Sequence, residues 1–379
     1  MKKITYLVSV AVIGAALAAC NDANVNLSDK EKALKEVVKP YVENTVIATY
    51  NAMASEGLAL LADVEAIQEA VKNEQDYTAK MAAAGESWRR MRHHWEQSEA
   101  FLYGPADKHY IDPHIDSWPL DYNEMNALLT DTARMAKIEE DGGAYVGDKL
   151  GYALKGFHAA EYLLFKEGQP HECNLTSAEA AYLVGIVEDL VQQAIILEDC
   201  WAGGVNEEKK ALITDEEGES MSWGENYAEY FMNLTHPDWK TYQAVAEQIV
   251  AGCVEIAGEV ADLKMGNPYR SSNKEEQEYI ESPYSYTSTI DFADNIISIK
   301  NSYCGAKAGD AAIADYIKKQ DAELNSKVLA AIEESIALIE KIKDFETKAQ
   351  GDADVKAAID KVSELEALLD DEVMPLLSK

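Results

Sequence analysis

The chain has 379 residues, of which 68 are acidic and 34 are basic, so its formal net charge at pH 7 is -34. A chain this acidic repels phosphate backbones, which excludes nucleic acid as a partner. Its length is sufficient for two modest domains.

The first twenty residues have the pattern of a bacterial lipoprotein signal. Lys2 and Lys3 precede an apolar stretch, residues 4–16, that is too short to span a bilayer. Small residues then lead to Cys20 in the sequence LAAC. An ordinary signal peptide with a chance cysteine is the alternative. We expect residues 1–19 to be removed and Cys20 to carry acyl chains, which anchor the protein in a membrane.

Such an anchor predicts a location in the bacterial cell envelope. We expect the outer membrane, with a periplasmic or a surface-facing orientation both open. We find no second stretch that is long and apolar enough to span a membrane. Export would also allow disulfides, but four cysteines permit three pairings and their spacing does not choose among them; they are Cys173, Cys200, Cys253 and Cys304.

The rest of the chain has the periodicity of helices. Residues 20–29 are expected to be a tether, within which Ser28 can cap the first helix. Val328, Ile332 and Ile336 recur every four residues and predict one apolar helical stripe. No run of alternating residues predicts a buried strand. The expected fold is therefore all-α.

A polar, acid-rich break follows Gly203 and Gly204 and extends to about Pro237. It divides the chain into two sets of helices, consistent with two helical bundles packed side by side. The expected domains are an N-terminal bundle, a linker region and a C-terminal bundle, which cover residues 30–204, 205–236 and 237–379.

The most informative local pattern is GFHAAE at residues 156–161, within a helix expected over about residues 144–165. His158 and Glu161 are three residues apart, so they share a helix face and can converge on one point. Imidazole and carboxylate together suit zinc or iron. Gly156 inside a helix would allow close approach of a neighbouring helix or a ligand. An unrelated His and Glu is the alternative for so short a pattern.

The sequence around this pattern resembles the imelysin-like family, whose signature is Gly-x-His-x-x-Glu. Matching blocks occur in order along the chain. Upstream are WRRMR at residues 88–92, SEAFLYGP at 98–105 and IDSWPLD at 115–121, and downstream is ESPYS at 281–285 followed by DFADNI at 291–296. Each block alone is weak, but the succession is specific.

The resemblance implies two helical bundles with a site near their junction, in envelope proteins often linked to iron acquisition. Carried over by position, the metal ligands would be His158, Glu161 and Glu99, where Glu99 comes from the SEAF block. Further pocket residues would be Ser282, Ser285 and Asp291. Tyr286 stands where the family often has histidine, so no ligand role is expected there.

Three functions remain open from the residues and the resemblance. The first is binding of a divalent or ferric ion, iron or zinc, or of a metal chelate, in an uptake role that implies a partner protein of the uptake system. The second is a metallopeptidase, because the founding family member was described as one. Tyr162 stands where the inverted zinc motif His-x-x-Glu-His needs its second histidine, which disfavours that reading. The third is a scaffold whose polar site locks the two bundles together.

Overall fold

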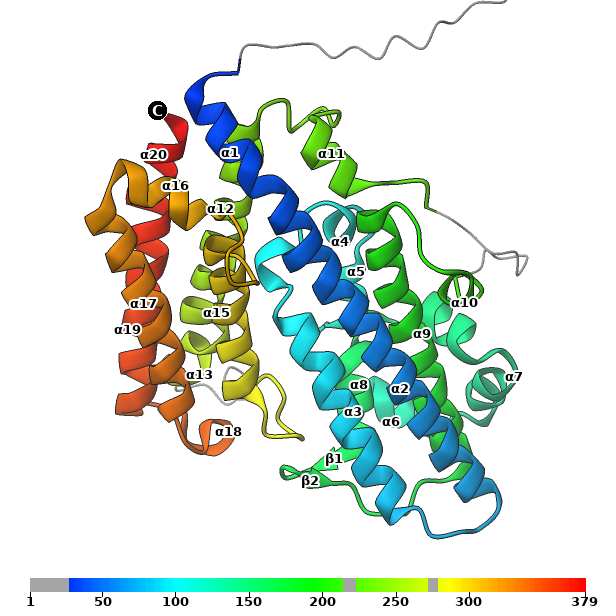
Figure 1. The fold of residues 1–379 in the computed structure, drawn as a ribbon. Helices are drawn as coiled ribbons and strands as arrows, with labels where there is room; N and C mark the ends of the chain where they lie inside the picture. Colours follow the sequence, from blue (N-terminus) through cyan, green and yellow to red (C-terminus); the bar gives the residue numbers. More distant parts are fainter. Residues whose placement is uncertain (1–26, 214–222, 272–278) are drawn as a thin grey trace, which may run out of the picture.

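The computed structural model describes residues 27–213, 223–271 and 279–379. It confirms the all-α prediction, because helices account for nearly all regular structure there (Figure 1). The expected signal peptide, Cys20 and most of the tether lie outside these residues, as does part of the expected linker.

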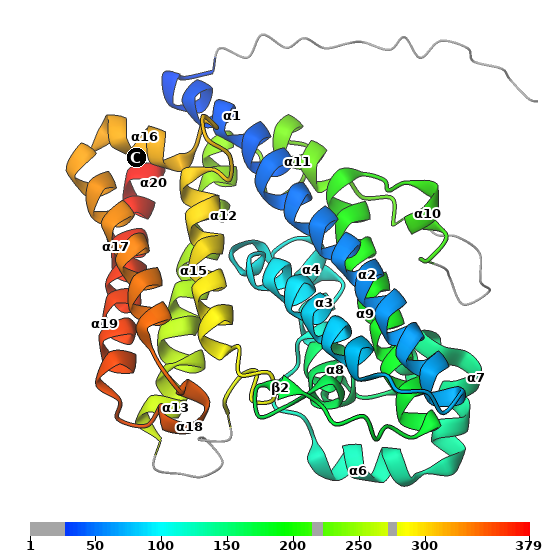
Figure 2. The same ribbon diagram turned by 60° about the horizontal axis from the view of Figure 1, so that its bottom comes forward.

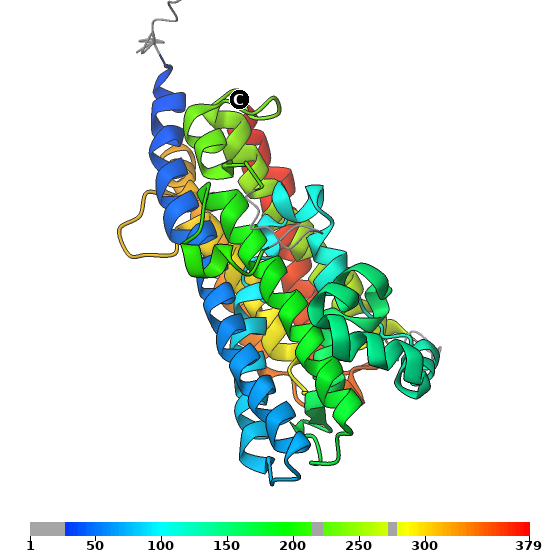
Figure 3. The same ribbon diagram turned by 90° about the vertical axis from the view of Figure 1, so that its right-hand side faces the viewer.

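The first half of the chain is built around three long helices and a group of short ones. Here α2 packs against α3 and α9, and α9 also packs against α7. Seen from the side, α9 runs between α2 and α7 (Figure 3). The elements are α1 (Asp29–Pro40), η1 (Tyr41–Ile47), α2 (Ala48–Lys72), α3 (Thr78–Glu96), η2 (Glu99–Phe101), α4 (Pro105–Lys108), α5 (Ile111–Ile115), α6 (Tyr122–Thr130), α7 (Thr132–Lys149), η3 (Tyr152–Leu154), α8 (Gly156–Leu164), α9 (Ser177–Ala202), α10 (Glu207–Lys210) and α11 (Tyr227–Asn233).

The second half forms another bundle, in which α12, α15, α17 and α19 pack side by side (Figure 1). Asp321 and Asp352 cap α17 and α19 by accepting backbone hydrogen bonds at their first turns. The elements are α12 (Tyr242–Glu259), η4 (Val260–Lys264), α13 (Gly266–Arg270), α15 (Ser288–Cys304), α16 (Ile313–Gln320), α17 (Ala322–Lys341), α18 (Phe345–Lys348), α19 (Ala353–Ala367), η5 (Leu368–Val373) and α20 (Met374–Ser378).

The two bundles meet along α3 and η2 on one side and α12 and α15 on the other. The helix α1, which the sequence places with the first bundle, also packs against α12. There Glu31 accepts hydrogen bonds from the backbone N–H groups of Tyr242 and Gln243, at 2.8 and 3.1 Å. Because α1, η1 and α2 run on without a break, one helical rod contacts both bundles (Figure 1).

Two sequence expectations need correction. The described residues include one short antiparallel pair of strands, β1 (Phe165–Lys166) and β2 (Gln169–Pro170), which the search for buried strands did not reveal. The helix α9 is also long and apolar enough to pass as a membrane span. Most of its apolar window is buried inside the bundle, however, and this burial accounts for its composition.

None of the four described cysteines is in a disulfide.

The helix that carries His158 is shorter than the sequence suggests. It begins at Gly156 instead of near residue 144, because α7 ends at Lys149 and the chain turns through η3. Gly156 has φ +78°, and a Cβ there would overlap the backbone carbonyl of Ile115. Glycine at this position therefore lets the start of α8 lie directly on the end of α5.

This contact gives a matched pair of stability predictions. Gly156→Ala should lower the free energy of unfolding by roughly 2–5 kcal/mol, because a Cβ is disfavoured at this φ and overlaps a backbone atom. Gly151→Ala should change it by less than about 0.5 kcal/mol, since that site has φ -65° and no neighbour within 4 Å. Urea unfolding of the two variants measures the difference, and equal stabilities would contradict the argument.

Candidate metal centre

His158 and Glu161 lie at the junction of the bundles, where both side chains are at most 1% exposed. Nδ1 of His158 is 3.1 Å from Oε2 of Glu161. The other ring nitrogen, Nε2, lies 3.2 Å from Oδ1 of Asp116 but lacks the geometry of a hydrogen bond. Glu161 therefore orients the imidazole through Nδ1, and Nε2 faces Asp116.

The second half of the chain closes over this pair. The other oxygen of Glu161 accepts three hydrogen bonds, from the backbone N–H groups of Tyr284 and Ser285 at 3.1 and 2.8 Å and from the Ser285 hydroxyl at 2.7 Å. Gly168, in the turn between the short strands, donates to the Tyr284 carbonyl at 2.8 Å. Figure 2 shows the segment before α15 reaching β2 in this way.

Arg92 of α3 is the central cation of the junction, and it is 1% exposed. Its guanidinium lies 2.5 Å from Glu96 and 2.7 Å from Glu281, pairs with Asp116, and lies 3.8 Å from Asp291. Glu281 and Asp291 come from the second half of the chain. One buried arginine therefore holds carboxylates from both halves.

Lys264 of η4 makes the reciprocal set of contacts. Its ammonium is 3.3 Å from Glu281, 3.7 Å from Glu96 and 3.9 Å from Glu99. The lysine comes from the second half, whereas Glu96 and Glu99 come from the first. Each half thus supplies a buried cation for carboxylates of the other.

The buried charges shift one another's pKa values. Burial opposes protonation of His158, but its interactions with Asp116 and Glu161 outweigh burial and raise its pKa to about 9. Burial alone would raise the pKa of Asp116, yet Arg92 and His158 hold it below its usual range. For Asp291, burial prevails over Arg92 and raises the pKa to about 7. Asp116 is thus held ionised beside His158.

The predicted site residues are divided between two neighbouring groups. One ligand atom each from Asp116, His158 and Glu281 lies within 4.8 Å of the others, and the same holds for Glu96, Glu99 and Asp116. Glu99 therefore belongs to the second group, and Asp116 is the one residue that this group shares with the group of His158. Glu161 positions His158 and is in neither group.

The three second-half candidates lie in the network around these groups. Ser285 donates to Glu161, and the Ser282 hydroxyl donates to Asp291 at 2.5 Å. Asp291 lies beside Arg92. The structure brings all three to the junction as hydrogen-bonding residues.

Sequence reasoning missed the two carboxylates nearest Nε2, Asp116 and Glu281. Both stand inside the blocks that carry the resemblance, IDSWPLD and ESPYS. Their position in these two blocks was the one feature of the sequence that could have marked them as site residues. Their distance of 42 and 123 residues from His158 hid the contact, because helical spacing relates only near neighbours.

A cavity of about 700 Å³ adjoins the site between the bundles. Among the residues that the structure describes, Lys264 is its one basic lining residue, and seven lining residues are acidic: Glu99, Asp107, Asp112, Asp116, Glu255, Glu259 and Glu281. Burial, reinforced by Asp116, raises the pKa of Asp112 to about 7. Asp112 is therefore only partly ionised near pH 7, but the excess of carboxylates over basic groups in the described lining still favours a cationic ligand.

Comparison with known proteins agrees with this architecture. The sequence profile described as Imelysin matches residues 46–371, which is most of the chain. The chain belongs to the imelysin family. This confirms the resemblance seen in the sequence blocks.

Individual relatives of this imelysin-family chain carry names related to iron. Iron-regulated protein A of Synechococcus elongatus is 25% identical over 349 residues, which cover 90% of this chain and 86% of the relative. The crystal structure of a candidate iron-regulated protein A precursor from Parabacteroides distasonis has a TM-score of 0.76 and 26% identity, covering 92% of this chain and 96% of that one. An imelysin-like protein from Psychrobacter arcticum shares the fold, with a TM-score of 0.67, 11% identity and the same coverages.

The buried ion-pair network predicts an unequal response of two nearby arginines. Arg92→Met should lower the free energy of unfolding by roughly 3–5 kcal/mol, because it leaves several buried carboxylates without their cation. Arg90→Met should cost less than about 1 kcal/mol, since Arg90 is half exposed and pairs with Glu56 at the surface. Chemical denaturation measures both, and a small loss for Arg92→Met would show that the junction does not depend on this cation.

Proposed function

We propose that this protein is a membrane-anchored envelope lipoprotein that binds a metal ion for an iron-related role. Its ligands would be Nε2 of His158 and carboxylate oxygens of Asp116 and Glu281. The observation that carries the proposal is the buried Nε2, which lies 3.2 Å from Asp116 without hydrogen-bond geometry and has one oxygen each of Asp116 and Glu281 within 4.8 Å. Because the pKa of His158 is raised to about 9, a metal ion would displace the ring proton when it binds. One imidazole with two carboxylates is a donor set that iron and zinc both accept.

The remaining residues would support the ion without contacting it. Glu161 fixes the ring of His158 through Nδ1, and the segment with Tyr284 and Ser285 fixes Glu161. Arg92 and Lys264 offset the charge of the carboxylates. A bound ion would act as a Lewis acid toward ligands in the cavity.

The charge of the cavity distinguishes a bare ion from a chelate. An anionic chelate would be repelled by the described cavity wall, because seven of its lining residues are acidic and Lys264 is basic. A hydrated cation would be attracted by the same carboxylates. We therefore favour a free ion, or a chelate without net negative charge, as the species that binds.

The metallopeptidase remains the second candidate, because the cavity beside the donor set is large enough for part of a peptide. Glu161 is unsuited to be its general base, since both of its oxygens are already engaged. A scaffold without ligand is the third candidate, supported by the ion pairs that join the halves.

Metal analysis tests the site directly. The mature chain, purified without an affinity tag, should retain iron or zinc, and His158→Ala should weaken binding by at least roughly 100-fold because it removes a ligand. Glu161→Gln should weaken it by roughly 10–100-fold, as expected of a group that positions a ligand. His171→Ala is the matched control, because the ring of this half-buried histidine lies away from both metal groups and hydrogen-bonds to the backbone carbonyl of Glu172. Equal metal contents in His158→Ala and wild type would refute the proposal, and metal-dependent peptide cleavage lost in His158→Ala would favour the peptidase.

The anchor has its own test. Cys20→Ala should move the protein from the membrane fraction to the soluble fraction, because the acylated residue is lost. The four other cysteines serve as controls, and Cys173→Ala at an exposed site should leave the protein with the membrane. Retention of Cys20→Ala on membranes after a salt wash would argue against lipidation at this residue.

A further inference from the structure

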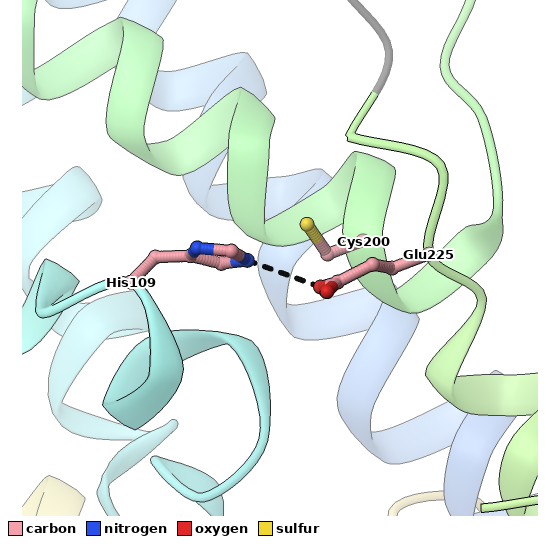
Figure 4. A group of neighbouring side chains, drawn as sticks. All are labelled: His109, Cys200 and Glu225. Atoms are coloured by element: carbon pink, nitrogen blue, oxygen red, sulfur yellow. Dashed lines mark hydrogen bonds and ion pairs between the residues drawn. The ribbon is translucent and has the colours of Figure 1, made fainter.

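A third group of metal-ligating side chains lies within the first half of the chain, apart from the two groups around Asp116. His109 follows α4, Cys200 lies in the last turn of α9, and Glu225 precedes α11. One ligand atom from each lies within 4.8 Å of the others. The Nε2 atom of His109 is 3.1 Å from Oε2 of Glu225, and Figure 4 shows the side chain of Cys200 beside this pair.

Glycine residues bring these three segments together. Gly203 ends α9 with φ +73°, and a Cβ there would overlap the side-chain amide of Asn226. Gly104 precedes α4 with φ +75°, and a Cβ there would lie 2.9 Å from the ring of Tyr227. Both positions need positive φ and close approach, which only glycine supplies at low cost. The residues next to Glu225 are thereby held against both neighbouring segments.

The surroundings suit a bound cation. Cys200 is fully buried, whereas the side chains of His109 and Glu225 are 16% and 10% exposed and leave a path for an ion. The ring of Trp223 packs edge-on against His109, with centroids 4.4 Å apart, and fixes its orientation. Thiol, imidazole and carboxylate are the three ligand types that zinc uses in proteins.

Two other roles for this group fit less well. A cysteine nucleophile needs access and a lowered pKa, but Cys200 is fully buried, and burial together with Glu225 raises its thiol pKa. A purely structural hydrogen bond accounts for His109 and Glu225. A structural role for Cys200 would need only its packing in the apolar core and its contact with Glu225, so metal binding by all three residues has to be decided by experiment.

We propose that His109, Cys200 and Glu225 form a second, sulfur-containing site for zinc or a similar borderline divalent cation. Ligand atoms around tetrahedral zinc lie roughly 3.3–3.8 Å apart, so the group needs only a modest contraction from its present span. Binding would release the Cys200 thiol proton to solvent, and water would complete the coordination. The ion would tie the segment of Glu225 to the end of α9.

Lys108 competes with a metal ion for this site, because its ammonium pairs with the carboxylate of Glu225. The lysine must yield that oxygen, or share it, when a cation binds. Its side chain is 56% exposed, so it can swing into solvent. Removal of this competing charge should tighten metal binding.

Cobalt(II) in place of zinc provides a readout specific to this site. The reduced, metal-free mature protein titrated with cobalt should show thiolate-to-cobalt charge-transfer absorption in the near ultraviolet, which a site without sulfur cannot give. Cys200→Ser should abolish the band, and His109→Gln or Glu225→Gln should weaken cobalt binding by at least roughly tenfold. Lys108→Met should strengthen it several-fold. Far-ultraviolet circular dichroism verifies the fold of each variant.

The controls separate this site from the other one. Cys253→Ser removes another fully buried thiol and should leave the band intact. His158→Ala should also leave it intact, since the band reports only sulfur ligation. If Cys200→Ser does not fold, the His109→Gln and Glu225→Gln variants, which keep the thiol, decide the matter. Absence of the band in folded wild-type protein, or its survival in Cys200→Ser, would overturn the proposal.

Discussion

The structure depends on one buried guanidinium, that of Arg92. It is nearly free of solvent contact and bridges Glu96 and Asp116 of the first half with Glu281 of the second. So many carboxylates could not be buried together without a cation, because each charge taken out of water costs several kcal/mol. The planar fork of arginine presents five N–H donors in fixed directions, whereas the three donors of a lysine ammonium rotate about one nitrogen. Ion pairs therefore stabilise the junction of the bundles together with apolar packing. The directions of the Arg92 N–H groups determine where the carboxylates lie.

The same network decides how the site residues divide their tasks. His158 lies between two carboxylates, and each ring nitrogen faces a different one. Glu161 is satisfied by donors from the segment that follows Glu281, so the orientation of the imidazole depends on the second half of the chain. Asp116 is held ionised by Arg92 and by His158. The donor set is complete only when the two bundles are packed together, which couples folding of the whole chain to the site.

Local sequence patterns predicted what is local in this fold. Helical periodicity along the chain, of which the stripe of Val328, Ile332 and Ile336 is one example, predicted the all-α fold, because helical packing repeats every three to four residues. The extent of the helix around His158 was wrong, since the positive φ of Gly156 depends on contact with Ile115, which no spacing rule reveals. The pairing of His158 with Glu161 was visible at three residues' separation. Asp116 and Glu281 were in recognised blocks, but only the fold shows that they surround Nε2.

The two candidate metal sites differ in the property that selects ions. The His158 site offers nitrogen and oxygen ligands beside an acidic cavity, so it suits harder cations that arrive with their water. The His109 site offers a buried thiol and lies among the short elements near the end of α9, so it suits a softer ion that stays in place. Acidic residues line the cavity at the first site, whereas a single lysine competes for the carboxylate at the second. Both donor sets accept zinc, because each has an imidazole and a carboxylate. The thiol of Cys200 is the ligand that separates them, since it strengthens the preference of the His109 site for a softer ion, whereas the oxygen-rich His158 site also suits iron.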